Sequence, residues 1–98
     1  VEAFAKVGKF VGKLQGPLVL CGDLNITHEA PAMRNLDFLR DLTDEHKIKT
    51  TLSGLKFNGP VPCDHIMVND RVQVNHFAVL DALASDHLPV EADIELSC

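Results

Sequence analysis

Two short runs of consecutive apolar residues constrain the fold of this chain more than any other feature of its sequence. Residues 18–20 read Leu-Val-Leu, and residues 66–68 read Ile-Met-Val. Because neighbouring side chains of a β-strand point to opposite faces, each run predicts a strand that is buried on both sides. A chain of 98 residues forms one compact domain at most, so few other elements are available to cover these strands.

The spacing of apolar residues predicts two helices. The first covers residues 1–15, and the second covers residues 31–42 with Pro31 in its first turn. The second helix lies between the two apolar runs, which gives the order strand, helix, strand. Each helix has one apolar face, as expected of a helix that packs against a sheet.

Alternation of apolar and polar residues predicts the remaining strands. Residues 71–79 change phase near His76, as in a strand with a β-bulge, and residues 88–96 alternate without interruption. Another short strand is predicted at residues 48–52, within an irregular segment at 47–62 that we expect to lie near the site.

These elements predict an α/β domain with one mixed sheet of about four strands and about two helices on one face. Two short helices cannot cover both faces of such a sheet. We therefore expect the other face to be covered by a missing part of the protein or by a second copy of the chain.

Charge and cysteine content restrict the partners. The chain has nine basic and fourteen acidic side chains, a net charge of −5, which disfavours a large nucleic-acid footprint and fits cation binding better. Cys21, Cys63 and Cys98 form no Cys-x-x-Cys pair. They are expected to be reduced thiols, with Cys21 and Cys63 in the core, which favours a reducing intracellular compartment. A membrane span needs a run of about 20 apolar residues, and the sequence contains none.

Three motifs with acidic residues stand where apolar runs stop or start. Gly-Asp-Leu-Asn at 22–25 follows the first run, Cys-Asp-His at 63–65 precedes the second, and Ser-Asp-His at 85–87 precedes the last strand. Taken singly, each motif is typical of a turn or a cap. One sheet could nevertheless bring five side chains to a common edge: Asp23, Asn25, Asp64, Asp86 and His87.

The residue types at this edge suit metal-assisted hydrolysis of a phosphoester. Histidine has a reference pKa of about 6.5, so His87 can serve as acid or base near neutral pH. Asp23 and Asp86 offer the hard oxygen ligands that Mg²⁺ prefers, and Asn25 can donate to a phosphoryl oxygen. A Ser or Cys nucleophile is less supported, because no strand-to-helix elbow surrounds either residue type. His65 is expected to be a surface or loop histidine.

The three motifs, in this order, resemble the C-terminal half of the endonuclease/exonuclease/phosphatase superfamily. This superfamily includes pancreatic-type deoxyribonucleases, abasic-site endonucleases, neutral sphingomyelinases and inositol polyphosphate phosphatases. Residues 22–25 are similar to its Gly-Asp-Phe-Asn motif, residues 64–66 to its Asp-Tyr-Ile motif, and residues 85–90 to its Ser-Asp-His-x-Pro-Val signature. This chain differs from these motifs at two positions, with Leu24 in place of Phe and His65 in place of Tyr. Both positions are next to candidate site residues and are not themselves among them.

The resemblance implies a role for each site residue. Asp23 would orient or deprotonate the attacking water, Asn25 would hold the scissile phosphate, and Asp64 would orient His87. His87 would bind or protonate the phosphoryl group or act as the base. The resemblance also implies a metal site with Asp86, Asp23 and Asn25 as ligands for Mg²⁺, with Mn²⁺ as an alternative.

The resemblance further implies that residues 1–98 are a single-domain fragment, one half of a four-layered α/β sandwich. In the family the N-terminal half supplies an Asn and the principal metal-binding Glu. The isolated chain is therefore expected to hydrolyse phosphoesters weakly or not at all. Nucleic acid, a phospholipid head group and a small phosphoester all remain open as substrates.

Two hypotheses from other classes compete with a hydrolase. The first is a non-catalytic interaction module, or a homodimer formed through the sheet face, which a stable monomer at micromolar concentration would exclude. The second is a small zinc domain that uses Cys63, His65 and His87, which the absence of stoichiometric zinc after dialysis would exclude.

Overall fold

The computed structural model describes residues 2–52, 62–80 and 87–96. Its elements follow in the order α1 (Glu2–Gly12), β1 (Val19–Asp23), the 3₁₀ helix η1 (Pro31–Leu36), β2 (Arg40–Asp41), α2 (Leu42–Glu45), β3 (Asp64–Val68), β4 (Val72–Val79) and β5 (Val90–Leu96). The strands form two antiparallel sheets, one with the order β1-β3-β2 and the other made of β4 and β5. The α/β class is confirmed, and the arrangement is compatible with a fragment of an α/β sandwich.

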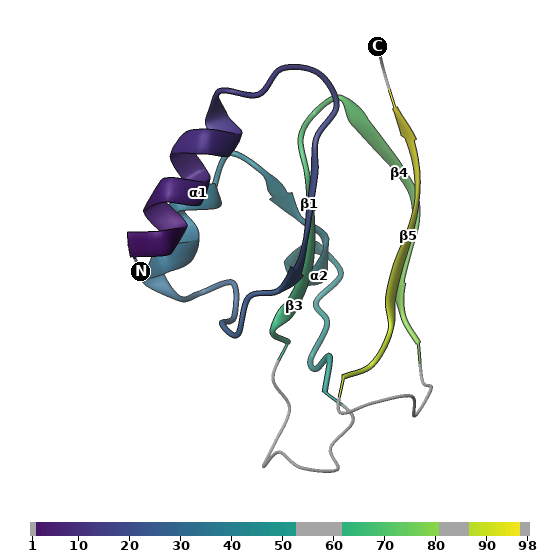
Figure 1. The fold of residues 1–98 in the computed structure, drawn as a ribbon. Helices are drawn as coiled ribbons and strands as arrows, with labels where there is room; N and C mark the ends of the chain where they lie inside the picture. Colours follow the sequence, from purple (N-terminus) through teal and green to yellow (C-terminus); the bar gives the residue numbers. More distant parts are fainter. Residues whose placement is uncertain (1, 53–61, 81–86, 97–98) are drawn as a thin grey trace.

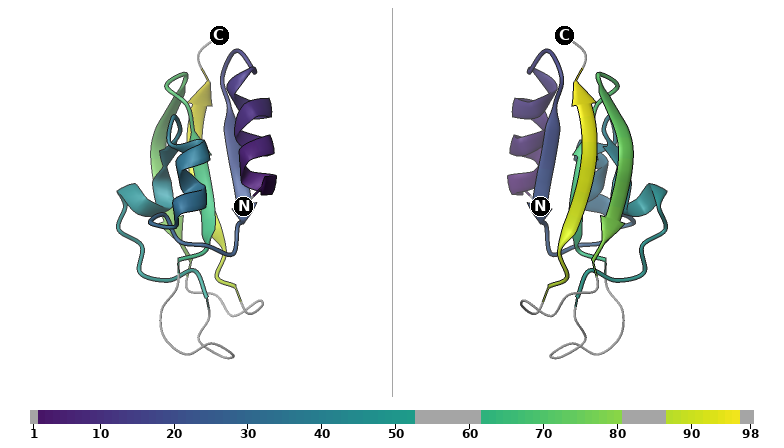
Figure 2. Two further views of the ribbon diagram at one scale, coloured as in Figure 1. Left: turned by 90° about the vertical axis from the view of Figure 1, so that its left-hand side faces the viewer. Right: turned by 90° about the vertical axis from the view of Figure 1, so that its right-hand side faces the viewer.

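The elements are stacked in three layers (Figures 1 and 2). Helix α1 and η1 cover one face of the β1-β3-β2 sheet, and the β4-β5 hairpin lies against its other face. Two apolar cores fill the spaces between the layers. The first contains Val11, Met33, Leu36, Leu39 and Met67, and the second contains Leu42, Val68, Val72 and Phe77.

Strand β3 is buried on both faces, as its apolar run predicts. Met67 is 1% exposed and belongs to the core beneath the helices, whereas Val68 is 0% exposed and belongs to the core beneath the hairpin. Burial of each side chain stabilises the fold by roughly 1.5–3 kcal/mol relative to exposure. The β4-β5 hairpin therefore covers much of the second face of the sheet. From the sequence, we expected a missing part of the protein or a second copy of the chain to cover that face.

The prediction that the strand is buried on both faces is wrong for β1. Leu18 and Leu20 pack under the helices, but Val19 is 40% exposed. Val19 pairs with Val68 and so shares its face of the sheet. The hairpin has only two strands and covers β3, but it does not enclose Val19 of the neighbouring edge strand.

The structure also corrects the expected single mixed sheet and the expected helix over residues 31–42. The sheet is divided in two, and the helix is replaced by η1, β2 and the short α2. Met33, Leu36 and Leu39 recur at every third position, which matches the three residues per turn of a 3₁₀ helix better than the α-helical period. The backbone bonds are correspondingly short in range, as in Asp37 N–H to Arg34 C=O.

The other strand predictions are largely confirmed. The register of β4 against β5 shifts between Val74 and His76, where the sequence predicts a bulge. The short strand expected at 48–52 is reduced to a single bridge between Leu52 and His87. Most of the loop expected at 47–62 lies outside the described residues. No helix of the described part is long and apolar enough to cross a membrane.

Gly8 allows α1 to approach η1 closely. A methyl group at Gly8 would clash with the backbone carbonyl oxygen of Asn35, whereas a methyl group at Gly12 would meet nothing within 4 Å. A backbone oxygen cannot move aside as a flexible side chain can, so the contact fixes the distance between the two helices.

We expect Gly8→Ala to lower the free energy of unfolding by about 1–3 kcal/mol, because α1 must shift away from η1. Gly12→Ala is the matched control, which should stabilise the chain by up to about 1 kcal/mol through helix propensity. Urea unfolding followed by circular dichroism measures both. A Gly8→Ala variant as stable as Gly12→Ala would show that the close approach does not exist.

Candidate functional site

Four of the five predicted site residues are described by the structure, and three of these meet at one end of the two sheets. Asp23 ends β1 and Asp64 begins β3, and the two residues are paired across the strands. His87, which precedes β5, places Nδ1 2.7 Å from Asp64 Oδ2 and Nε2 3.5 Å from Asp23 Oδ2. The structure thus brings a carboxylate to each nitrogen of one imidazole ring.

The two carboxylates differ in exposure. The Asp64 side chain is 16% exposed, whereas those of His87 and Asp23 are 35% and 37% exposed. An ionised carboxylate can only accept a hydrogen bond, so Nδ1 of His87 donates to Asp64. Nε2 is then the nitrogen that faces Asp23.

Thr51 holds the backbone on which Asp64 stands. Its buried Oγ1 accepts hydrogen bonds from the backbone N–H groups of Cys63 at 3.1 Å and Asp64 at 3.0 Å. The Thr51 carbonyl accepts a third bond from the N–H of Leu88 at 2.7 Å. One residue therefore ties together the segments that carry Asp64 and His87.

A second threonine secures the same position. Thr43 Oγ1 donates to the carbonyl oxygen of Asp64 at 2.8 Å. Sequence reasoning identified neither Thr51 nor Thr43, because a lone threonine outside any motif gives no signal of a long-range contact.

Asn25 lies beside Asp23 in a strained conformation. Its backbone has φ of 59°, a left-handed value that asparagine tolerates better than most residues. Its N–H donates to Asp23 Oδ1 at 2.9 Å. The other carboxylate oxygen, Asp23 Oδ2, is the one that lies near His87. The exposed Asn25 side chain is close in sequence to the site, whereas Asp86 lies outside the described residues.

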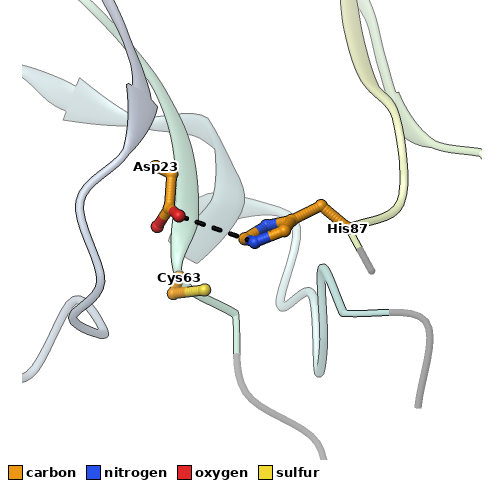
Figure 3. Close-up of side chains that lie close together, drawn as sticks. All are labelled: Asp23, Cys63 and His87. Atoms are coloured by element: carbon orange, nitrogen blue, oxygen red, sulfur yellow. Dashed lines mark ion pairs between the residues drawn. The ribbon is translucent and has the colours of Figure 1, made fainter. Parts of the chain in front are cut away.

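Cys63 adds a thiol to the site. Its side chain is buried, as predicted, whereas Cys21 is exposed, which corrects the expectation that both pack in the core. Burial raises the pKa of the Cys63 thiol above its ordinary value. The ligand atoms of Asp23, Cys63 and His87 lie within 4.8 Å of one another, and Figure 3 shows the three side chains converging.

A cleft of about 260 Å³ opens beside these residues. It lies between the β1-β3 pair and the beginning of β5, and its lining includes Asp23, Asp64, Ile66 and Val90. Among the described residues, the acidic groups that line it are Asp23 and Asp64. A phosphate entering the cleft would therefore be repelled unless a cation accompanied it.

His65 belongs to a separate, buried network and is not the surface or loop histidine expected from the sequence. Its Nδ1 lies 2.8 Å from Asp41 Oδ2, and its Nε2 lies 2.8 Å from the carbonyl oxygen of Ile26. His28 Nδ1 lies 3.0 Å from the same Asp41 oxygen. Both ring nitrogens of His65 are thus occupied, which disfavours the competing hypothesis of a zinc site made of Cys63, His65 and His87.

Both nitrogens of His65 face oxygen acceptors, which favours the doubly protonated ring. Burial alone would disfavour that charge, but hydrogen bonds to Asp41 and Ile26 and the charge of Asp41 outweigh it and raise the pKa of His65. Burial likewise opposes ionisation of Asp41, yet its bonds to His65 and His28 lower the pKa of that carboxyl. The two groups therefore form a buried ion pair whenever the His65 ring is protonated, and each favours the charged form of the other.

We expect Asp41→Asn to lower the free energy of unfolding by about 3–5 kcal/mol, because it leaves the His65 charge unpaired. The amide oxygen can still accept from Thr43 N–H and cap α2. The exposed Asp44 provides the control, since Asp44→Asn should change stability by less than about 0.5 kcal/mol.

The pair should also make stability depend on pH. Asp41 contributes above its unfolded pKa of about 3.9, and this contribution is lost as pH falls through its lower folded pKa. His65 contributes fully below its unfolded pKa of about 6.5, and its contribution is lost as pH rises through its higher folded pKa. Urea unfolding across this range should show the effect of Asp41→Asn shrinking at high pH, and a pH-independent effect would refute an ion pair.

Comparisons with curated proteins and with solved structures gave no match. The sequence profile described as "Endonuclease/Exonuclease/phosphatase family" matches residues 3–87. The match covers most of the 98 residues and includes Asp23, Asp64 and His87, the three side chains that meet at the site. This chain therefore belongs to the endonuclease/exonuclease/phosphatase family. Membership of this family suggests a hydrolase that acts on phosphoesters such as nucleic acids.

Proposed function

We propose that this chain carries half of the active site of a Mg²⁺-dependent phosphoester hydrolase in which water attacks phosphorus. The observation that carries the proposal is the His87 ring held between Asp64 and Asp23. A partly buried carboxylate that fixes the tautomer of a partly exposed histidine is an arrangement that serves proton transfer. Family membership supplies the class of substrate.

Each residue has a role that its geometry supports. Asp64 orients His87 through the 2.7 Å hydrogen bond to Nδ1. Nε2 of His87 and Oδ2 of Asp23 are 3.5 Å apart and face the same space. A water bound there would be within reach of both groups. Either Asp23 takes its proton while His87 binds or protonates the phosphoryl group, or His87 takes the proton while Asp23 orients the water. Asn25 is proposed to donate to a phosphoryl oxygen.

The donor set beside the cleft fits a hard cation. Asp23 and the Asn25 side chain offer oxygen ligands, and Mg²⁺ is usually held by one or two carboxylates together with the substrate phosphate. Asp86 is the further ligand implied by the family resemblance, and Mn²⁺ could replace Mg²⁺. When bound, the cation would offset the repulsion between the cleft carboxylates and a phosphate and would polarise the phosphoryl group.

The remaining metal ligands are proposed to come from outside these 98 residues, as the family resemblance implies. The alternative, a non-catalytic interaction module, loses support because the β4-β5 hairpin already covers one face of β3. Val19, Ile94 and Leu96 are exposed, so apolar surface remains near the edge of both sheets for contact with further protein. Such contact would serve a hydrolase assembled from two parts equally well.

Hydrolysis of bis-nitrophenyl phosphate in the presence of Mg²⁺ tests the proposal. We expect weak turnover by the 98-residue chain and efficient turnover by a longer gene product that contains it. In the longer product His87→Ala should reduce kcat by about 10² to 10⁴, the usual contribution of a positioned acid or base. His76→Ala is the matched control, because His76 is an exposed histidine on β4.

Two results would contradict parts of the proposal. Full activity of His87→Ala in the longer product would remove His87 from the mechanism. Efficient turnover by the isolated chain, abolished by His87→Ala, would show that these residues form a complete site.

A further inference from the structure

We propose that Asp23, Cys63 and His87 form a binding site for a thiophilic divalent cation such as Zn²⁺, which differs from the Mg²⁺ ligand set and shares only Asp23 with it. The three residues stand on different segments, at the end of β1, before β3 and before β5, and their side chains converge (Figure 3). Carboxylate oxygen, thiolate sulfur and imidazole nitrogen are each ligands that zinc takes in proteins. The binding rests on this geometry and does not depend on the proposed hydrolase.

The distances are close to those of a bound ion. Zn²⁺ sits about 2.0–2.3 Å from its ligands, so two ligand atoms of a tetrahedral site lie about 3.3–3.8 Å apart. The ligand atoms of the trio are within 4.8 Å of one another, and His87 Nε2 is already 3.5 Å from Asp23 Oδ2. The ligand atoms would need to draw together by at most about 1 Å, from 4.8 Å to about 3.8 Å, to reach the separation of a bound site.

Asp64 prepares His87 to act as a ligand. Metal-binding histidines usually donate their other ring N–H to a carboxylate or carbonyl, which fixes the ring and increases its basicity. Nδ1 of His87 donates to Asp64 at 2.7 Å, and this bond directs Nε2 towards Asp23 and Cys63. The supporting partner is itself held by Thr51 and Thr43.

The surroundings of Cys63 also suit a metal-bound thiolate. Thr51 Oγ1 lies 4.0 Å from Cys63 Sγ and can donate a weak hydrogen bond to it. Burial disfavours a free thiolate, but coordination to a divalent cation reverses this preference because the ion supplies the compensating charge.

The ligand types separate this site from the Mg²⁺ site. Thiolate and imidazole select Zn²⁺ and similar ions, whereas Mg²⁺ prefers carboxylate and carbonyl oxygens. The two sites share only Asp23. A cation held by the trio would occupy both Nε2 of His87 and Asp23, and under the proposed function it would therefore oppose hydrolysis.

Cobalt and zinc titrations of the metal-free, reduced chain test the site. We expect one Co²⁺ per chain, with a thiolate-to-cobalt charge-transfer band that one equivalent of Zn²⁺ removes. Cys63→Ser should abolish the band and weaken Zn²⁺ binding by about 100-fold or more, while Asp64→Asn should weaken it by about 10- to 100-fold. Isothermal titration calorimetry gives the affinities, and circular dichroism checks that each variant is folded.

Cys21→Ser is the matched control, because Cys21 is an exposed thiol on β1 that lies outside the trio. It should leave both the band and the affinity unchanged. The proposal is overturned by the absence of a charge-transfer band, by Zn²⁺ binding that survives Cys63→Ser, or by equal loss in Cys21→Ser. None of these results requires hydrolytic activity, so they are distinct from a failure of the proposed function.

Discussion

The hydroxyl group of Thr51 connects the segments on which the candidate site stands. Its oxygen accepts from the N–H groups of Cys63 and Asp64, and its one proton points towards Cys63 Sγ. A hydroxyl has two acceptor lone pairs and one donor, so all of its hydrogen-bonding capacity is used here. Through its backbone, the same residue accepts from Leu88, next to His87. The site is thus fixed by a buried residue that has no chemical role of its own.

The layered core gives this contact a rigid base. Met67 and Val68 are neighbours in sequence but belong to opposite cores, so β3 cannot shift along its length without disturbing both. Asp64 begins the same strand and is paired with Asp23 at the end of β1. A strand packed on two sides therefore sets the separation of the two carboxylates, and the His87 ring lies between them.

The sequence was sufficient to predict the class of fold and the convergence of Asp23, Asp64 and His87. Both predictions depend on strong local signals, namely apolar runs and motifs at their ends. The prediction of one helix over residues 31–42 was wrong, because apolar residues at every third position were taken as evidence of an α-helix. The two antiparallel sheets could not be predicted either, since strand pairing depends on contacts between distant residues.

The role of His65 shows the same limit at the level of one side chain. Its ring is buried only because Asp41 and Ile26, far from it in sequence, place acceptors at both nitrogens. Thr51 is a comparable case, since its partners Cys63 and Asp64 lie 12 and 13 residues away in sequence. Residues whose importance comes from such long-range hydrogen bonds carry no motif by which the sequence can identify them.

The most direct test of this account is the protonation pattern of the His87 ring, measured by long-range ¹H–¹⁵N correlation spectra. At a pH where the ring is neutral, we predict that its proton resides on Nδ1 in the wild-type chain and in Thr51→Ser, which keeps the hydroxyl. Thr51→Val leaves two buried N–H groups without an acceptor, each costing about 1–3 kcal/mol, and should release Asp64 so that the neutral ring samples both tautomers. A folded Thr51→Val variant that retains the Nδ1 proton, or a wild-type ring protonated on Nε2, would contradict the account.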